Sequence, residues 1–258
     1  MSASSSFRDR IRQADMETVK AGIRRANRFA AYSSGLPRLI NRFRARRSRD
    51  VLFIWVPKAA GTSIYNWLHA EIGMLKLKEP FAVRGGFPGR GPVTFGHMDV
   101  SLLIERGLVK ETFVDHALCF ALVRNPFSRA VSLYKYLHER RRVTGDLTDF
   151  LEVVAQGVEA VGLYNSVGLS QANPQCRWLF RRSGHLFPHK IWKVEELEQR
   201  IPEIRACIGV EHAPAFLNKS SGRVPELSGR DIDLIRSIYE EDFERLGYSV
   251  DPKDCVVA

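Results

Sequence analysis

The hydrophobic and polar positions of the chain predict two strand–turn–helix units. The first begins at residue 51, where the unbroken apolar stretch VLFIWVP has the composition of a buried parallel strand. KAAGTS follows, and then IYNWLHAEIG, whose large apolar side chains recur on one helical face. The second unit repeats this order, with HALCFALV (116–123) as its strand and RNPFSRAVSLYKYLHERR as its turn and helix.

Local signals place the starts of two helices. Asn125 is a favoured N-cap, and Pro126 fits the first helical position, so the second unit's helix starts there. Ser228 and Asp231 resemble a capping box, which predicts a helix in the C-terminal part of the chain. One more strand is expected near HKIWKV (189–194).

The stretch between the two units is predicted from its turn residues. Gly and Pro recur in residues 76–95, KLKEPFAVRGGFPGRGPVTF, so we expect a loop there. GHMD (96–99) follows, and then a short helix around SLLIERGL. Residues 147–205 are expected to be mostly helical. Strands separated by helical segments indicate an α/β fold with a central, mainly parallel sheet flanked by helices.

Composition narrows the class of protein. The chain has 258 residues, of which 45% are hydrophobic and 26% charged, as in an ordinary globular protein. No apolar run is long enough for a transmembrane helix, and the N-terminus lacks the apolar core of a secretory signal. The four cysteines form no C-x-x-C pair, which argues against a zinc ribbon and favours reduced thiols in a cytoplasmic protein.

The net charge of +10 is concentrated at one end. Residues 1–50 hold 13 of the 39 Lys and Arg residues but only 4 of the 29 Asp and Glu residues. A nearly neutral body argues against a nucleic-acid binder. We expect residues 1–50 to form a basic, Arg-rich helical extension, which is either solvated or docked on an anionic membrane surface or an anionic glycan. Its apolar residues recur at roughly helical spacing: Phe7, Ile11, Val19, Ile23 and Phe29.

The turn after the first strand has the features of an anion site. A helix N-terminus offers unpaired N–H groups and the positive end of a dipole, and Gly61 allows close backbone approach. Thr62 and Ser63 add hydroxyl groups, and Lys58 adds a positive charge, so the turn predicts a phosphate or sulfate site. The order of residues is not that of a Walker A loop, in which the lysine follows the last glycine. An ordinary capped turn with a surface lysine is the alternative.

The turn after the second strand predicts a partner site. Arg124 stands where the strand ends, and open parallel sheets bind ligands outside the carboxyl ends of their strands. Ser128 and Ser132 are four residues apart on the following helix, so Arg124 and Ser132 are expected to hold one anion together. Arg129 either adds to this site or forms a structural pair. Two anion sites on one sheet edge indicate a ligand with two separated anionic groups, such as a nucleotide with phosphates at both ends of its ribose.

These motifs resemble those of one enzyme family. WVPKAAGTSIYNWL resembles the 5′-phosphosulfate loop of sulfotransferases that use 3′-phosphoadenosine 5′-phosphosulfate (PAPS), in the carbohydrate-modifying branch known as sulfotransferase family 2. ALVRNPFSRAVSLY is similar to that branch's 3′-phosphate motif, FGHMD to its G-H segment, and the sequence ending in DFERLGY to its C-terminal half. The resemblance runs from about Val51 to Tyr248. It departs at Ala59, where many members carry Thr or Ser, and is weak over 140–190.

The resemblance implies a P-loop-like, three-layer α/β catalytic domain at residues 51–258, in a soluble, bacterial-type member. It implies transfer of a sulfuryl group from PAPS to a hydroxyl of a carbohydrate acceptor, which is a polysaccharide, oligosaccharide or glycolipid, with PAP as the product and no metal. The residues to which it assigns the 5′-phosphosulfate are Lys58, Ala59, Ala60, Gly61, Thr62 and Ser63. It assigns the 3′-phosphate to Arg124 and Ser132.

The catalytic roles follow in the same way. His97, at the position of the family's G-H histidine, is the expected base, with Asp99 close enough to orient it. Lys58 is expected to neutralise the charge that develops as PAP leaves. A loop containing Lys219, Ser220 and Ser221 is expected near the 3′ side of the nucleotide.

Two other functions stay open at this stage. One is a P-loop-type phosphotransferase that uses ATP, and the other is a non-catalytic basic module that binds polyanions or an anionic membrane. We expect a cytoplasmic protein that contacts the inner face of the membrane peripherally through residues 1–50, with no nucleic-acid partner.

Overall fold

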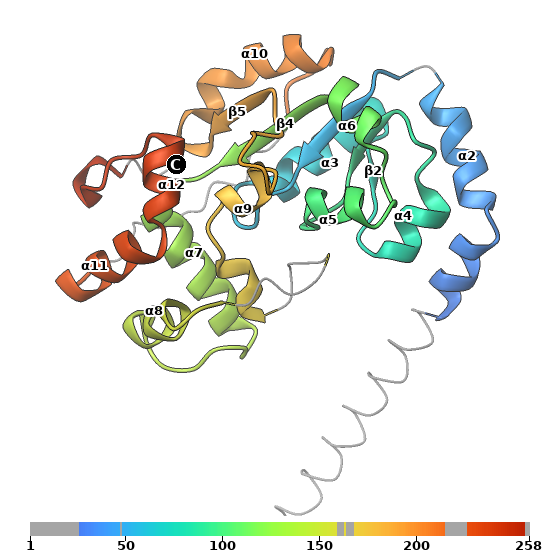
Figure 1. The fold of residues 1–258 in the computed structure, drawn as a ribbon. Coiled ribbons are helices and arrows are strands. Elements are labelled where there is room, and N and C mark those ends of the chain that lie inside the picture. Colours follow the sequence, from blue (N-terminus) through green and yellow to red (C-terminus); the bar gives the residue numbers. More distant parts are fainter. Residues whose placement is uncertain (1–25, 47, 159–162, 164–167, 215–225, 256–258) are drawn as a thin grey trace, which may run out of the picture.

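A computed structural model gives the fold and describes residues 26–46, 48–158, 163, 168–214 and 226–255 (Figure 1). Within these residues the strands form one sheet of five, in the order β2-β3-β1-β4-β5, and every neighbouring pair is parallel. The strands are β1 (Val51–Ile54), β2 (Leu75–Lys76), β3 (Pro92–Thr94), β4 (Leu118–Val123) and β5 (Lys190–Lys193).

Helices connect and flank the strands. The α-helices are α2 (Leu36–Ala45), α3 (Gly61–Ile72), α4 (Pro80–Gly86), α5 (Val100–Glu105), α6 (Glu111–His116), α7 (Pro126–Glu139), α8 (Leu147–Ala155), α9 (Cys176–Leu179), α10 (Leu197–Ile208), α11 (Gly229–Ile238) and α12 (Glu240–Leu246). Short 3₁₀ helices are η1 (Gly168–Ala172), η2 (Val194–Glu196) and η3 (Pro252–Asp254). Residues 26–33 are also helical. The predicted α/β class with a central parallel sheet and a P-loop-like, three-layer arrangement is confirmed.

The two predicted strand–turn–helix units lie side by side at the centre of the sheet. β1 pairs with β4, so that Val51 lies opposite Leu118 and Ile54 opposite Ala121. Every residue of β1 is buried, as expected for a strand covered on both faces. Because the strands are parallel, the turns that follow β1, β3 and β4 emerge at the same edge.

The predicted helix starts are confirmed. Asn125 caps α7 by accepting a hydrogen bond from the N–H of Phe127 at 2.9 Å, and Pro126 is the first helical residue. Ser228 and Asp231 form the capping box of α11, each side chain bonding the other's backbone N–H. These local signals survive in the fold because they satisfy backbone groups that the helix itself leaves open.

Apolar side chains pack in two clusters. The larger one surrounds the sheet and includes Ile64 and Leu68 of α3. The smaller one fills the space between α7, α8, α11 and α12, around Phe127, Phe150 and Phe243. Figure 1 shows α10 beside β5 at one end of the sheet and α2 with α4 at the other. The site described below lies between the sheet edge and the start of α7.

The prediction of a loop over residues 76–95 was wrong. α4 and the short strands β2 and β3 occupy much of that stretch. The glycines that signalled a turn serve packing instead, since a Cβ on Gly85 would lie 2.1 Å from the backbone oxygen of Tyr32. Strands of two and three residues are too short for hydrophobic periodicity to detect.

The basic extension is described only from residue 26 onward. α2 packs on α4, where the buried Asn41 side chain donates to the carbonyl oxygen of Gly86 at 2.8 Å. The rest of the predicted amphipathic segment, residues 1–25, lies outside the described residues. None of the helices in the described part of the chain is long and apolar enough to cross a membrane.

Candidate active site

The turn between β1 and α3 has an unusual backbone. Lys58 and Ala60 both take left-handed conformations, with φ of 66° and 54°. Ala60 is the N-cap of α3, and its carbonyl oxygen accepts from the N–H groups of Ser63 and Ile64. Left-handed residues of this kind curl a chain so that neighbouring N–H groups face one hollow, and the first N–H groups of a helix lack intrahelical acceptors. The turn therefore has a backbone suited to an anion, and the binding of an anion there stays a prediction.

Gly61 is required by a tryptophan. A Cβ at position 61 would lie 1.9 Å from Nε1 of Trp55, whose indole packs against the start of α3. We predicted that this glycine permits close approach of a ligand, but within the described residues its missing side chain makes room for the indole. Gly61 thus connects the end of β1 to the start of α3.

Lys58 extends from this turn toward α7. Its Nζ lies 4.5 Å from the centre of the Tyr136 ring. Burial lowers the pKa of Lys58, the positive charge of Arg124 lowers it further, and Glu139 opposes both effects. The influence of Arg124 means that the cations of the two predicted anion turns lie close together.

Arg124 is buried at the end of β4. Its Nε donates to the hydroxyl of Ser128 at 3.0 Å, and its backbone N–H donates to Oε1 of Gln175 at 2.9 Å. Burial lowers the pKa of Arg124, although a guanidinium keeps its charge in proteins, and Glu195 partly offsets the shift. Ser128 therefore positions Arg124, and Ser132, one turn further along α7, faces the cavity.

A cavity of about 310 Å³ joins the two turns at the sheet edge. Its volume is in the range of small-molecule sites. The residues that line it are Trp55, Lys58, Ala60, Gly61, Thr62, Ser63, His97, Arg124, Ser132, Tyr136 and Gln171. Every residue predicted for the two anion turns or as the base is among them, except Ala59, whose side chain is buried in the core.

Three lining residues were missed by the sequence reasoning. Trp55 and Tyr136 belong to the hydrophobic pattern of their elements. Hydrophobic periodicity alone does not distinguish a residue that lines a cavity from one in the core. Gln171 lies in η1, within residues 140–190, where the sequence carries no recognisable motif. The helical spacing of Ser132 and Tyr136, four residues apart on α7, is the one signal that places Tyr136 beside the predicted anion site.

Arg129 has a structural role. Its guanidinium is fully buried and donates to the backbone oxygens of Pro57, Gln171 and Asn173 at 3.1, 2.9 and 2.9 Å. These bonds join α7 to the turn after β1 and to η1, and so bring Gln171 to the cavity. Of the two roles that the sequence allowed for Arg129, this geometry favours the structural one.

His97 is held in one tautomer. Its Nδ1 lies 2.9 Å from the carbonyl oxygen of Trp55, which can only accept, so Nδ1 carries the proton and Nε2 has the lone pair. Burial lowers the pKa of His97 to about 4, the hydrogen bond to Trp55 opposes this, and the charges of Lys76, Lys78 and Arg129 lower it further. The ring is therefore neutral near pH 7 and able to accept a proton.

The expectation that Asp99 orients His97 was wrong. Asp99 is the N-cap of α5, where its carboxylate accepts from the N–H of Leu102 at 3.3 Å. Its other oxygen lies 3.8 Å from Arg177. Capping α5 holds the Asp99 carboxylate at the start of that helix. The backbone carbonyl of Trp55 orients the His97 imidazole instead.

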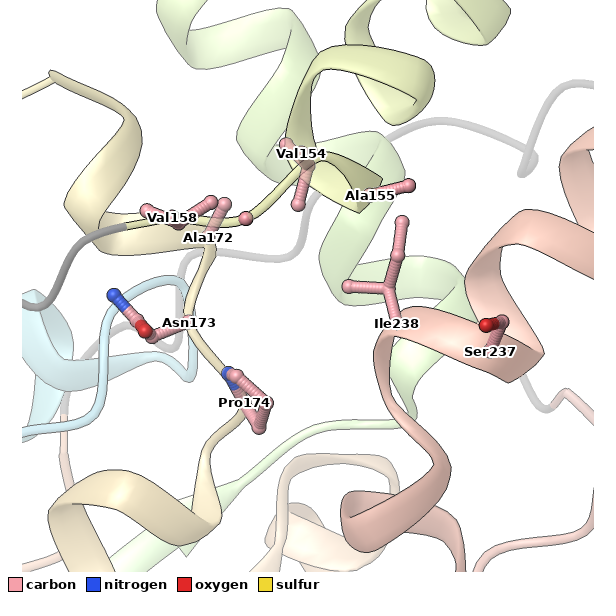
Figure 2. A pocket seen from close by; sticks show the side chains of 9 residues that line it. Val154, Ala155, Val158, Ala172, Asn173, Pro174, Ser237 and Ile238 are labelled. Carbon is pink, nitrogen blue, oxygen red and sulfur yellow. The ribbon is translucent and has the colours of Figure 1, made fainter.

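Two other hollows differ from this cavity in chemistry. Figure 2 shows one of about 300 Å³ between α8, η1 and α11, with side chains such as Val154, Val158 and Ile238 around it. Its described lining carries no charged residue. A larger one, of about 470 Å³, contains arginines, but Arg181 and Arg245 are paired there with carboxylates. Among the described residues, neither lining contains a lysine, whereas the sheet-edge cavity combines Lys58 with Arg124.

Two further predictions concern a metal and a loop. In the part of the chain that the structure describes, no three His, Cys, Asp or Glu side chains are grouped so that they could hold a metal ion. The loop expected near the 3′ side of the nucleotide, with Lys219, Ser220 and Ser221, lies outside the described residues.

Comparisons with known proteins agree with the motifs. Residues 41–249 match the model of the sulfotransferase family. A sulfotransferase structure from Alicyclobacillus acidocaldarius aligns with 19% identity over 77% of this chain and 94% of that chain, with a TM-score of 0.46. A mouse sulfotransferase structure, SULT7A1 complexed with PAP, aligns with 17% identity over 82% and 71% of the two chains, with a TM-score of 0.36. None of the curated proteins compared with the chain matches it significantly.

Proposed function

The chain belongs to the sulfotransferase family, and we propose that it transfers a sulfuryl group from PAPS to a hydroxyl of a carbohydrate. The observation that carries this proposal is the convergence of both predicted anion turns on one cavity. Lys58 and Arg124 come from different turns, yet they line the same hollow beside the neutral imidazole of His97. A donor with anionic groups at both ends needs this arrangement.

The residues of the cavity fit the donor. Lys58 and the start of α3, with the hydroxyls of Thr62 and Ser63, would hold the 5′-phosphosulfate. Arg124 and Ser132 would hold the 3′-phosphate, with Arg124 positioned by its bond to Ser128.

The transfer step uses His97 and Lys58. The oxygen of the acceptor hydroxyl forms a bond to sulfur while the bond from sulfur to the phosphate oxygen of PAP breaks. Nε2 of His97 takes the hydroxyl proton, and Lys58 neutralises the negative charge that develops on the leaving oxygen. Anionic groups near His97 favour its charged form, so the bound donor raises the basicity of the ring. Sulfuryl transfer, like phosphoryl transfer, depends mainly on such positioning and charge.

The acceptor and the location belong to the same proposal. Both loops resemble those of the carbohydrate-modifying branch, which supports a polysaccharide, oligosaccharide or glycolipid as the acceptor. We assign catalysis to residues 51–258. The extension, residues 1–50, is proposed to hold the enzyme peripherally on an anionic membrane at the cytoplasmic face. α2 supports this, because apolar side chains on it are exposed to solvent between arginines.

The experiment combines PAP binding with transfer of labelled sulfate to a panel of oligosaccharides. Lys58→Ala and Arg124→Ala are each expected to weaken PAP binding at least tenfold and to abolish most transfer, because each removes a charge from the donor site. His97→Ala is expected to change PAP affinity less than twofold and to lower transfer about 10²–10⁴-fold. Lys110→Ala, an exposed lysine away from the cavity, is the control and should match wild type.

Two results would contradict the proposal. If His97→Ala lost as much PAP affinity as Arg124→Ala, His97 would be a ligand of the donor and not the base. If ATP bound more tightly than PAP, the alternative of an ATP-dependent phosphotransferase would replace the sulfotransferase assignment.

A further inference from the structure

The segment DFERLGY (242–248) near the C-terminus is described in full, and it lies outside the lining of the sheet-edge cavity. It covers most of α12 and the turn after it, beside the start of α7 (Figure 1). Gly247 ends the helix in a left-handed conformation, with φ of 63°, and its carbonyl oxygen accepts from Nζ of Lys193 at the end of β5, at 2.7 Å. The segment is thereby held between β5 and α7, next to the turn that contains Arg124.

The turn that contains Arg124 extends past the end of its pairing in the sheet. β4 ends at Val123, whose partner Lys193 is the last residue of β5, so that strand pairing among the described residues stops before Arg124 and Asn125. Both of these residues are buried, and buried backbone N–H and C=O groups need hydrogen-bond partners. Side chains from distant parts of the chain supply them.

Asp242 reaches Arg124 through Gln175. The amide of Gln175 is fully buried, accepts from the N–H of Arg124 at 2.9 Å and donates to the carbonyl oxygen of Arg124 at 2.8 Å, as a neighbouring strand would. The carboxylate of Asp242 in turn accepts from the backbone N–H groups of Gln175 and Cys176, at 2.8 and 2.9 Å. α12 thus fixes the residue that fixes the backbone of Arg124.

Tyr248 reaches the same turn through Glu195. One carboxylate oxygen of Glu195 accepts from the N–H of Asn125 at 2.8 Å, and the other accepts from the hydroxyl of Tyr248 at 3.2 Å. The ring of Tyr248 is contacted by Lys193, whose Nζ lies 4.4 Å from the ring centre. The negative charge of Glu195 also raises the pKa of Arg124, against the effect of burial. Glu195 therefore connects the C-terminal segment to both residues of the turn.

Phe243 provides a third contact. Its ring packs on that of Phe127, in the first turn of α7, with the ring centres 5.2 Å apart, and both rings are buried. Three residues of one segment thus converge on residues 124–127 through a buried amide, a carboxylate and an aromatic pair. The guanidinium that this backbone carries is then directed by the bond from Nε of Arg124 to the hydroxyl of Ser128.

We propose that the DFERLGY segment, acting through Gln175 and Glu195, positions Arg124 for the 3′-phosphate of the donor. This inference rests on the proposed function and adds a determinant of its specificity, because only a nucleotide phosphorylated at the 3′ position gains from a correctly placed Arg124. A guanidinium binds phosphate through hydrogen bonds in a fixed plane, so a small change of its backbone weakens the contact. The residues of the segment are positioning residues and touch no nucleotide.

The test compares PAP with adenosine 5′-phosphate (AMP), which lacks the 3′-phosphate, by calorimetric titration of the full chain. We expect wild type to bind PAP at least about tenfold more tightly than AMP. Glu195→Ala removes the acceptor for the N–H of Asn125 and should lower that preference about fivefold, with the affinity for AMP changed less than about twofold. Loss of a negative charge beside Arg124 would by itself strengthen phosphate binding, so a weaker preference reports position. Glu195→Gln keeps an acceptor oxygen and should retain most of the preference.

Tyr248→Phe tests the segment itself. The variant loses only a hydroxyl that bonds Glu195, so it should stay folded and its preference for PAP should fall about threefold. Tyr134→Phe is the matched control, because its hydroxyl bonds the carbonyl oxygen of Gly145 away from this turn, and it should behave as wild type. When Arg124 is already replaced by Ala, Tyr248→Phe should have no further effect on PAP affinity, since both changes act on one contact.

Four results would overturn the inference. They are an unchanged preference in Glu195→Ala, an equal loss of PAP and AMP affinity in that variant, a loss in Glu195→Gln as large as in Glu195→Ala, and effects of Tyr248→Phe and Arg124→Ala that simply add. Failure of wild type to bind PAP, or equal binding of PAP and AMP by wild type, would instead overturn the proposed function. The two failures are therefore distinguishable.

Discussion

At the scale of single residues, the site depends on how one imidazole is held. The carbonyl of Trp55 fixes the tautomer of His97, and burial keeps the ring neutral. In the proposed role of base, His97 would enter the reaction already deprotonated, with Nε2 available, and would need no carboxylate partner. This differs from the arrangement that the sequence predicted with Asp99.

The low pKa of His97 makes stability depend on pH. The folded ring has a pKa of about 4 against an ordinary value of 6.5, so the unfolded chain binds more protons between those values. Stability is therefore lost as pH falls below about 6.5. Between pH 7.5 and pH 4.5, wild type should lose roughly 2–3 kcal/mol more unfolding free energy than His97→Gln.

Urea unfolding at the two pH values measures this difference. His138→Gln, which removes an exposed histidine, is the control and should follow wild type. Wild type and His97→Gln losing the same free energy would show that His97 is not buried in its neutral form.

The sequence predicted which residues line the cavity better than it predicted their contacts. Lys58, Arg124 and Ser132, which were predicted from motif spacing, all line it. The bond from His97 to Trp55 joins residues 42 positions apart, and no local pattern encodes it. Gln171 was missed for the same reason, since the buried guanidinium of Arg129 draws η1 to the cavity.

At the scale of elements, the contact of Trp55, which follows β1, with the start of α3 determines the shape of the turn that is proposed to hold the donor. Gly61 begins α3 directly against the indole of Trp55. Trp55 also lines the cavity, and its backbone carbonyl oxygen accepts a hydrogen bond from Nδ1 of His97. A displacement of this indole would therefore disturb both the turn before α3 and the imidazole of His97.

Gly61→Ala tests that contact. The new methyl group would overlap the Trp55 ring, so the variant should lose about 1–3 kcal/mol of unfolding free energy, as overpacked cores do. It should also weaken PAP binding. Gly229→Ala is the matched control, because a Cβ there meets nothing within 4 Å and should cost no stability. Thermal and urea unfolding of the two variants give the comparison, and equal stability would contradict the role assigned to Gly61.

The sequence predicted the helices and strands that have a clear hydrophobic pattern or a helix cap, and it missed the short ones. β1, β4, α3 and α7 have full apolar patterns, so the sequence located them. β2 and β3 are too short to show a period, and α4 was hidden by Gly85 and Gly86, whose missing side chains admit Tyr32. These three elements exist because the sheet and the packing of residues 26–33 stabilise them.

At the scale of the whole molecule, charge and exposed apolar surface coincide at one end. The basic excess lies in residues 1–50, and α2 exposes an apolar stripe of Leu36, Leu39, Ile40 and Phe43. Their spacing places them on one side of the helix, and arginines alternate with them in sequence. Anionic lipid complements both features, because it accepts apolar side chains at the headgroup boundary and attracts guanidinium groups.

Liposome flotation tests this membrane contact. Wild type should float with vesicles containing anionic phosphatidylserine and much less with neutral phosphatidylcholine, since each basic residue near an anionic surface contributes about 1 kcal/mol. The Leu39→Ser/Phe43→Ser variant should lose at least fivefold in recovery. The matched control, Val153→Ser/Val250→Ser, removes exposed apolar side chains from other surfaces and should float as wild type. Equal recovery of wild type with anionic and with neutral vesicles would show that electrostatic attraction does not contribute to membrane binding.

The central claim is that the sheet-edge cavity binds a nucleotide with anionic groups at both ends, and a thermal-shift titration with PAP tests it most directly. A ligand at 100 times its Kd adds about 2.7 kcal/mol of stability. We predict that PAP raises the unfolding temperature of wild type, that ATP and ADP raise it much less, and that Arg124→Ala abolishes the response to PAP. No shift with PAP, or a larger shift with ATP, would contradict the account.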